Sequence, residues 1–293
     1  MSLFTYKLFC KIAEQGNMGR AAELMHISPS AASHAINALE EELGLPLLSR
    51  SRKGASLTPY GQQLLPRIRA IVQDEIRLHE EIDLINGLEK GVVNLGVVDS
   101  ICVRLLPAVL ESFRQKYPNI EVQVYQDDYN STRKMLKDGL LDLDFLPYPP
   151  DRIFNGNPVI QDRIMCVAPN DFVPANGAYV SADDLRDKEL ILPERGLEPY
   201  ILNFLTANNL TQSSQHNLTL ESSVLSLVIS GLGFSLMPEL VVKNHPGNYK
   251  AYPLINEPVR TLCLATLKGR PLSLACKKLI QEIKLVLADG SSL

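Results

Sequence analysis

The chain has 293 residues, which is long enough for two or more domains, and its 45% hydrophobic and 21% charged residues are ordinary for a folded protein. The first residues do not resemble a signal peptide, and no apolar stretch approaches the roughly 20 residues that cross a bilayer. We therefore expect a cytoplasmic protein with no membrane partner. Five scattered cysteines, without a CxxC or Cys/His cluster, predict neither a disulfide framework nor a metal or cofactor site.

The net charge of −4 is unevenly distributed along the chain. Residues 1–69 carry eight Lys and Arg against five acidic residues, a net charge of +3, which leaves −7 for residues 70–293. A basic head on an acidic body suggests that the head binds a polyanion. The placement of the charges matters more than their sum, because Arg50, Arg52 and Lys53 stand together.

The first 60 residues predict three short helices, because each apolar repeat is bounded by residues that favour helix ends. The expected caps are Thr5 and Gly16 for the first helix, Asn17 for the second, and Ser28 and Gly44 for the third. In the third helix, a proline follows the capping serine, and the buried stripe is Ala32, Ile36, Leu39 and Leu43.

Small polar side chains occupy another face of the third helix at its N-terminal end. A basic run with a glycine follows, which predicts a hairpin wing. A helix of this kind fits the DNA major groove, and basic residues on a wing bind phosphates. The expected DNA-binding residues are Ser28, Pro29, Ser30, Ser33, His34, Asn37, Arg50, Arg52 and Lys53. The alternative is a plain three-helix bundle with a solvated face. Residues 40–42, all Glu, should point away from DNA because they would repel phosphate.

The stretch NMGRAAELMHISPSAASHAINALEEELGLPLLSRSRKGASLTPYG resembles the head of LysR-type transcriptional regulators. The order and spacing of the matching positions are specific only when taken together; they are Ala21-Ala22, Leu24, Ser28, Ser33, Ile36, Leu39-Glu40, Leu43-Gly44, Leu47, Arg50, Leu57-Thr58 and Gly61. The chain departs from the family at Leu48, usually Phe, and at Pro29, where Gln is frequent. The departure at Pro29 removes a base contact, so the DNA sequence that this chain reads should differ from the sequences read by family members with Gln at this position.

A long helix is predicted to start at Thr58-Pro59. Its apolar positions follow a heptad seam that Glu75 interrupts: Leu64, Ile68, Ile71, Leu78, Ile82 and Ile85. We favour a homodimer seam, and packing of the helix onto its own chain is the alternative. The resemblance implies a dimer and usually a homotetramer. Asn86-Gly87 and Gly91 mark a hinge.

Alternating strand and helix patterns after the hinge predict a mostly parallel sheet in each of two lobes. This half resembles the family's effector domain, which is similar to periplasmic solute-binding proteins. The expected fold is therefore α plus α/β: a winged helix-turn-helix over 1–60, a linker and dimerisation helix with a hinge over 61–90, and a two-lobed effector domain over 91–293. Lobe 1 is expected at about 91–164 and 268–293, and lobe 2 at about 165–267.

Ligands of open α/β sheets bind beyond the carboxyl ends of the strands, where helices start. The expected effector-binding residues are Asp99, Ser100, Ile101, Asn130, Ser131, Arg195, Glu221 and Ser222. Plain helix capping is the alternative role for these residues, and a solvated loop is the alternative for Arg195. Asp99 would repel an acidic effector and could instead bind an amino or hydroxyl group. Cys102, beside it, is either a redox-sensing thiol or a quiet buried one.

The sequence favours a regulator over an enzyme. No GxSxG, HExxH, P-loop or GxGxxG arrangement stands in its proper context, and the five histidines are dispersed. A solute-binding or carrier protein would explain residues 91–293 but not the head. A third alternative makes the head a protein-interaction module. We predict a regulator that binds double-stranded promoter DNA and a small-molecule effector of unknown identity.

Overall fold

In the computed structural model, the chain divides into two compact units, Met1–Gly91 with Lys137–Leu140, and Val92–Leu136 with Leu141–Leu293. The structure describes residues 2–51, 54–85, 90–193, 199–211, 218, 220–256 and 258–289. Within these ranges, no helix is both long and apolar enough to cross a membrane.

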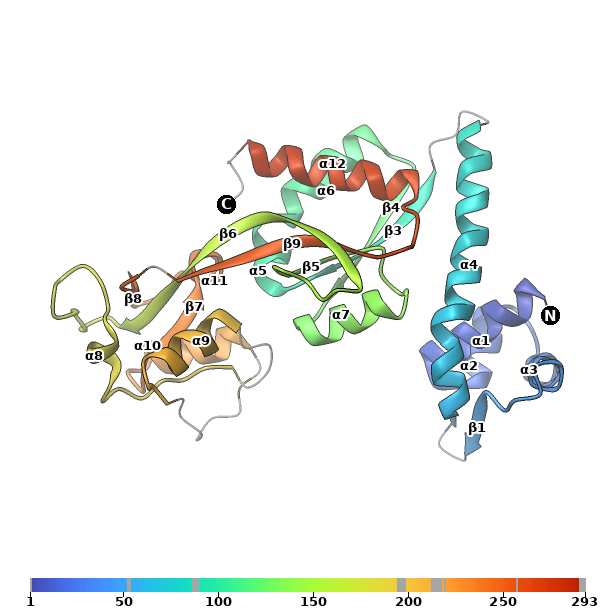
Figure 1. The fold of residues 1–293 in the computed structure, drawn as a ribbon, viewed down its shortest axis with the longest axis horizontal. Helices are drawn as coiled ribbons and strands as arrows, with labels where there is room; N and C mark the ends of the chain where they lie inside the picture. The colour runs from blue at the N-terminus through green and yellow to red at the C-terminus, as the bar shows by residue number, and fades with distance from the viewer. Residues whose placement is uncertain are drawn as a thin grey trace. The chain divides into compact units, whose positions relative to one another are not determined.

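The first unit is a small helical head followed by a two-stranded hairpin and one long helix (Figure 1). Its elements are α1 (Leu3–Gln15), α2 (Met18–Leu24), α3 (Pro29–Leu43), β1 (Leu48–Ser51), β2 (Gly54–Leu57) and α4 (Pro59–Ile85). The three short helices enclose one hydrophobic core, to which Phe9, Ile36 and Leu39 contribute fully buried side chains.

Local capping sets the boundaries of these helices, largely as predicted. Asn17 and Ser28 each accept the N–H of the residue three positions on, at 3.0 and 3.1 Å. Gly16 and Gly44 end α1 and α3 in the left-handed conformation. The predicted cap at Thr5 is wrong: α1 starts at Leu3 because the Ser2 hydroxyl accepts the Thr5 N–H.

The start of α4 is fixed against the segment that leads into the hairpin. The Thr58 hydroxyl donates to the Pro46 carbonyl at 2.6 Å and accepts the Gly61 N–H at 3.0 Å. Gly61 lies so close to this segment that a Cβ atom on it would come within 2.2 Å of the Leu47 carbonyl oxygen. A glycine is therefore required here by backbone-to-backbone contact.

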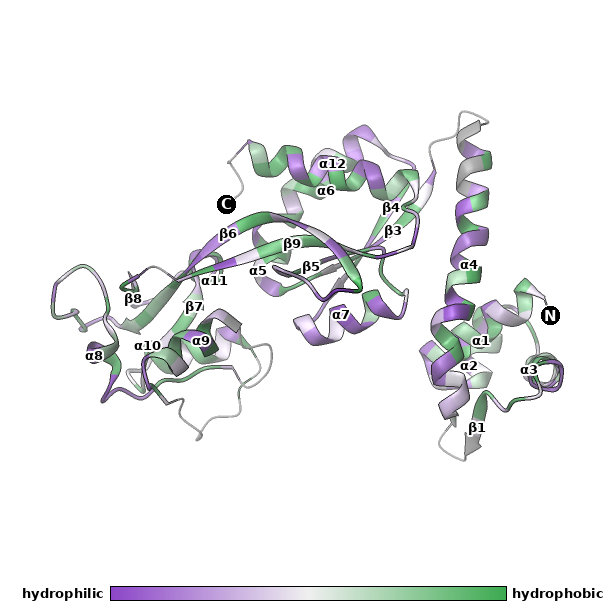
Figure 2. Cartoon of the chain, in the orientation of Figure 1, coloured by the Kyte–Doolittle hydropathy of each residue, from purple (hydrophilic) through white to green (hydrophobic). Residues whose placement is uncertain are grey.

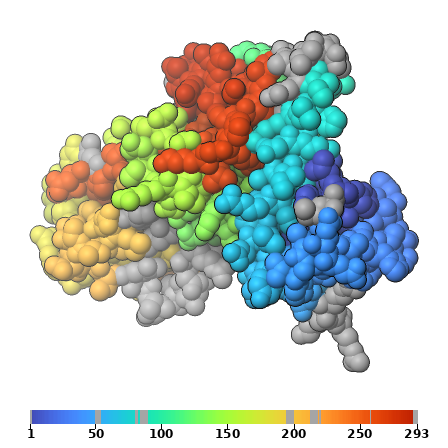
Figure 3. All heavy atoms as spheres, turned by 45° about the vertical axis from the view of Figure 1, so that its right-hand side comes forward, coloured from blue at the N-terminus to red at the C-terminus, as the bar shows by residue number. Residues whose placement is uncertain are grey.

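The head uses only the first part of the predicted heptad seam on α4. Leu65 and Ile68 are buried in the head core, and the Lys7 ammonium of α1 pairs with the Glu75 carboxylate at 2.8 Å. Four further apolar side chains of α4 are exposed: Ile71 (44%), Ile76 (37%), Leu78 (56%) and Ile82 (43%). Figure 3 shows α4, in cyan, at the surface of this unit.

The second unit contains two lobes joined by long strands (Figure 1). One lobe holds β3 (Gly91–Val97), α5 (Asp99–Arg104), α6 (Leu106–Lys116), β4 (Ile120–Gln126), α7 (Tyr129–Lys137), β5 (Leu143–Pro147) and α12 (Leu274–Ala288). The other holds α8 (Ala182–Leu185), α9 (Pro199–Ala207), α10 (Glu221–Ile229), β7 (Ser235–Pro238), α11 (Glu239–Asn244) and β8 (Tyr249–Pro253). The joining strands are β6 (Phe154–Pro169) and β9 (Val259–Leu267).

The strands follow the order β4-β3-β5-β9-β6-β7, with β8 also paired to β6. Figure 2 shows that β3 and β5 are mainly hydrophobic, whereas α6 and α12 carry one hydrophilic side. The expectation of a mostly parallel sheet is wrong. The pair β3–β5 is parallel. Strand β9 is antiparallel to β5 and also to β6. These antiparallel pairs arise because β6 and β9 both cross between the lobes.

One carboxyl group is buried in the sheet of the first lobe. Asp144 on β5 is 0% exposed, and among the described residues neither of its oxygens has a partner in normal hydrogen-bond geometry. Burial raises the pKa of Asp144 to about 8, against smaller lowering effects of the Thr132 hydroxyl and the Phe145 backbone. The acid is therefore mainly protonated in the folded chain at neutral pH.

We predict that Gly61→Ala destabilises the first unit by about 1–3 kcal/mol, because the added methyl group has to displace the Leu47 backbone. Urea unfolding followed by circular dichroism measures the change. Gly19→Ala is the matched control, because Gly19 lies in α2 and its new Cβ would come no closer than 3.3 Å to the nearest atom, the Asn17 side-chain oxygen. Equal stability of the Gly61→Ala variant and the parent would contradict the prediction.

We predict that Asp144→Asn removes a pH-dependent loss of stability. The folded chain keeps the Asp144 proton up to about pH 8, whereas the unfolded chain releases it near the ordinary value of 3.8, so rising pH favours unfolding across that window. The variant's gain in Tm over the parent should grow from about pH 4 to about pH 8 and then level off. Exposed Asp171→Asn serves as the control, and a gain that did not vary with pH would refute the proposed titration.

Candidate functional site

The third helix presents a polar N-terminal half to solvent. Its apolar face is buried through Ala32, Ile36 and Leu39. On the other side, the Ser28 and Ser30 hydroxyls lie 3.0 Å apart. Of the predicted DNA-binding positions on this helix, Ser33 is half-buried and the rest are exposed: Ser28, Pro29, Ser30, His34 and Asn37. The face is therefore accessible and made of short hydrogen-bonding groups.

The acidic residues of α3 lie at its far end. The Glu40 carboxylate accepts the N–H groups of Leu47 and Leu48 at 2.6 and 2.8 Å, so it anchors the start of the hairpin. Glu41 and Glu42 follow about 11 residues after the first turn, which at ~1.5 Å per residue is about 17 Å along the helix. Sequence reasoning missed the anchoring role of Glu40.

The predicted wing is a two-stranded antiparallel hairpin, in which Leu48 pairs with Leu57 and Ser51 with Gly54. The backbone of Arg50 belongs to β1, opposite Ala55. The Arg50 side chain, Arg52 and Lys53 lie outside the described residues, so their predicted phosphate contacts stay predictions.

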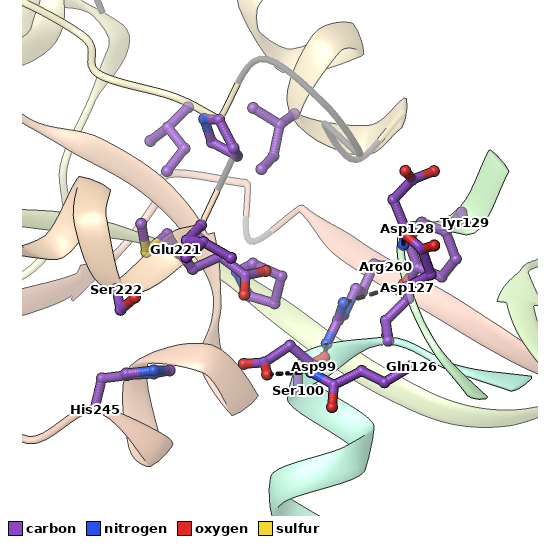
Figure 4. Close-up of a pocket in the computed structure, with 17 residues that line it drawn as sticks. Asp99, Ser100, Gln126, Asp127, Asp128, Tyr129, Glu221, Ser222, His245 and Arg260 are labelled. Carbon is purple, nitrogen blue, oxygen red and sulfur yellow. Dashed lines mark hydrogen bonds between the residues drawn. The ribbon is translucent and has the colours of Figure 1, made fainter. Parts of the chain in front are cut away.

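A cavity of about 480 Å³ opens in the second unit, bordered by the ends of several strands and helices (Figure 4). Four of the predicted effector-binding residues line it: Asp99, Ser100, Glu221 and Ser222. Ile101, Asn130 and Ser131 are not among the lining residues, and Arg195 lies outside the described part of the chain. The other polar lining residues are Gln126, Asp127, Asp128, Tyr129, His245 and Arg260.

Local hydrogen bonding explains which residues reach the cavity. Ile101 is fully buried in the core of the first lobe. The Asp128 carboxylate accepts the N–H groups of Asn130 and Ser131 at 2.8 and 3.1 Å, and the Ser131 hydroxyl also donates to it. Asp128 thus caps the start of α7, and the turn presents residues 127–129 to the cavity in place of the predicted pair.

A buried arginine forms part of the cavity wall. Arg260 on β9 stands directly opposite Asp162 on β6, and its guanidinium contacts the Asp162 carboxylate at 2.7 Å. The same guanidinium donates to the Ser100 hydroxyl at 2.8 Å and to the Tyr129 hydroxyl at 3.2 Å. Asp162 also accepts the Leu240 N–H at 3.1 Å. Arg260 is only 2% exposed, so the cavity rests on a structural ion pair.

Carboxylates outnumber cations on the described lining of this cavity. Asp99, Asp127, Asp128 and Glu221 line it, whereas the described arginine is the one paired with Asp162. The Asp99 carboxylate accepts a hydrogen bond from the Gln126 amide at 2.8 Å, which orients it. Among the residues that the structure describes, no three His, Cys, Asp or Glu side chains gather closely enough to hold a metal ion.

The thiol beside the cavity is not activated. Burial raises the pKa of the Cys102 thiol, and the Asp99 charge raises it further. Since the thiolate is the reactive form, a raised pKa favours an unreactive thiol over a redox-sensing one.

Comparison with known proteins places both units in one family. The LysR substrate binding domain matches residues 86–288, and the bacterial regulatory helix-turn-helix protein of the lysR family matches residues 3–62. The uncharacterised HTH-type transcriptional regulator YvbU of Bacillus subtilis is 27% identical, over 97% of this chain and 98% of its own length.

Two solved structures show the same fold over nearly the whole chain. A full-length OxyR variant from Pseudomonas aeruginosa has a TM-score of 0.77 at 22% identity, covering 97% of this chain and 95% of its own. Full-length CbnR in complex with its target DNA has a TM-score of 0.67 at 18% identity, covering 98% and 100%. The chain therefore belongs to the LysR family of transcriptional regulators, which join a DNA-binding helix-turn-helix to an effector-binding domain and are not enzymes.

Proposed function

We propose that residues 1–60 bind a two-fold related promoter site through the first turns of α3. The observation that carries this proposal is the exposed polar half of α3 opposite a fully buried apolar face. An α-helix fits the major groove, and short side chains allow the backbone to come close to base edges. The base-reading residues are Ser28, Pro29, Ser30, Ser33, His34 and Asn37, and Arg50, Arg52 and Lys53 bind the phosphates.

The chain acts as a homodimer that assembles through α4, within a linker of residues 61–90. The exposed apolar positions between Ile71 and Ile82 support this, because single chains rarely leave four large apolar side chains on one helix uncovered. Two helices paired along this stretch would carry two heads to successive major grooves. Pairs of dimers through residues 91–293 complete a homotetramer, as the family resemblance implies.

The cavity of the second unit binds a small-molecule effector. It lies where the crossing strands β6 and β9 join the two lobes, and residues of both lobes line it. A ligand that contacts both lobes changes the equilibrium between open and closed arrangements only through its different affinity for the two. The regulator works in the cytoplasm, where promoter DNA and metabolites are both accessible.

We predict that Asn37→Ala and Ser33→Ala each weaken binding to a selected duplex by about tenfold, because each removes a hydrogen-bonding group from the base-reading face. The target is selected from random duplexes with the parent chain, and gel shift at fixed salt measures the affinity. Glu41→Gln, exposed at the far end of the same helix, is the control. Circular dichroism melting checks that the variants fold, and undiminished affinity in both would exclude this face as the DNA contact.

A charge change on the exposed seam of α4 should disrupt the dimer. Leu78→Asp places a carboxylate at a position that is 56% exposed in the single chain. The substitution should therefore leave folding unchanged and weaken pairing of the two helices. Analytical ultracentrifugation should show smaller species than the parent at the same concentration. Gln62→Asp adds the same charge to an exposed position on another side of the helix and should leave the assembly intact. Identical assembly in both variants would place the dimer contact elsewhere.

A further inference from the structure

We propose that Asp144 and Thr132 form a proton-controlled contact, which holds helix α7 on the sheet of the first lobe at low pH and lets it loosen as the pH rises. The contact lies one helical turn from the residues of α7 that line the cavity, so its state determines how firmly that part of the wall is held. Its regulatory consequence rests on the proposed effector function, whereas the contact itself needs neither effector nor DNA.

The inward face of α7 carries one hydroxyl among larger side chains. Its buried residues are Tyr129, Thr132 and Leu136, and Thr132 is 0% exposed. Asp144 on β5 is also 0% exposed, and among the described residues neither it nor the Thr132 hydroxyl has a partner in normal hydrogen-bond geometry. The hydroxyl is nevertheless close enough to the carboxyl to lower the pKa of Asp144. Because buried polar groups are nearly always paired, this contact makes the position of α7 sensitive to the charge on Asp144.

The neighbouring strand leaves space for the carboxyl group. Gly96 on β3 stands in register with Asp144, and a Cβ atom on Gly96 would lie 2.6 Å from the Asp144 Oδ1 atom. It would also lie 2.6 Å from the Leu141 side chain. A side chain at position 96 would therefore displace the carboxyl group. The pairing of β3 with β5 thus accommodates an acid at this buried position, although no described cation contacts it.

The charged and titratable groups around Asp144 do not neutralise it. Arg133 of α7 lowers the pKa of Asp144, but the Arg133 side chain is 33% exposed and pairs with a different carboxylate. Arg270 contacts Asp142, two residues before Asp144, at 3.2 Å. The Cys263 thiol of β9 is neutral, because burial raises its pKa to about 11. Burial outweighs these influences and raises the pKa of Asp144 to about 8.

Release of the proton favours a loosened α7. A buried carboxylate is far less stable than a buried carboxylic acid unless a cation pairs with it, and one hydroxyl does not supply that charge. With α7 seated, Asp144 keeps its proton up to about pH 8, whereas a loosened helix admits water and returns the acid towards its ordinary pKa of 3.8. Loosening therefore releases one proton between these values, so its equilibrium constant should rise about tenfold per pH unit and level off above about pH 8.

Helix α7 connects this contact to the cavity. Thr132 follows Tyr129 by three residues, so the two lie on the same side of the helix, and the Thr132 N–H donates to the Asp128 carbonyl at 3.0 Å. Asp128 and Tyr129 line the cavity, and the Tyr129 hydroxyl accepts a hydrogen bond from Arg260 at 3.2 Å (Figure 4). Loosening of α7 weakens this bond and changes the wall that a ligand meets.

Hydrogen–deuterium exchange of the full-length chain, read by mass spectrometry, measures the opening of α7. At about pH 6, 7 and 8, and after correction for the intrinsic exchange rate, the amides of α7 should lose protection about tenfold per pH unit. They should also be less protected than the amides of α12. Asp144→Asn keeps the shape of the side chain without the titrating proton, so its α7 should show no such pH dependence. Asp171→Asn, at an exposed position, is the matched control and should behave as the parent does.

A second variant tests the partner of the acid. The Thr132 hydroxyl lowers the pKa of Asp144, so Thr132→Val should extend the pH-dependent range above about pH 8. An unextended range would refute the pairing of these two residues.

Two further results would overturn the proposal. Equal protection of α7 and α12 would mean that α7 opens only when the whole lobe unfolds. An unchanged pH dependence in Asp144→Asn would assign the titration to other groups. Because the measurement uses neither DNA nor a ligand, its failure leaves the proposed function in place. Loss of sequence-dependent duplex binding, measured separately by gel shift, would count against the regulator function instead.

Discussion

The ion pair between Arg260 and Asp162 holds the second unit together where its lobes meet. The two residues face each other on β9 and β6, the strands that run from one lobe into the other. Burying two charges costs several kcal/mol per ion and is offset only when the remaining donors and acceptors find partners. Ser100, Tyr129 and the Leu240 N–H supply them. Because these residues lie in the first turns of α5, α7 and α11, the ion pair also fixes the base of the cavity.

Much of the head could be predicted from sequence because its boundaries depend on neighbouring residues. The caps at Asn17 and Ser28 and the glycines that end α1 and α3 involve contacts within four residues, and a helical period marks the buried face. The anchoring role of Glu40 could not be predicted, because it joins α3 to the backbone at Leu47. The heptad seam was ambiguous for the same reason: only packing shows that Ile68 belongs to the head core.

Only part of the cavity could be predicted from sequence. Some of its residues are positioned by interactions with near neighbours in the chain, and others by interactions between distant strands. Asp99 and Glu221 stand at turns from strand to helix or from loop to helix, which a local pattern reveals. Arg260 resembles any polar residue of a strand until the register of β9 with β6 is known. That register could not be predicted, because residues 155–158, Asn-Gly-Asn-Pro, have the composition of a turn. In the structure they belong to the first part of β6, which runs on into the second lobe.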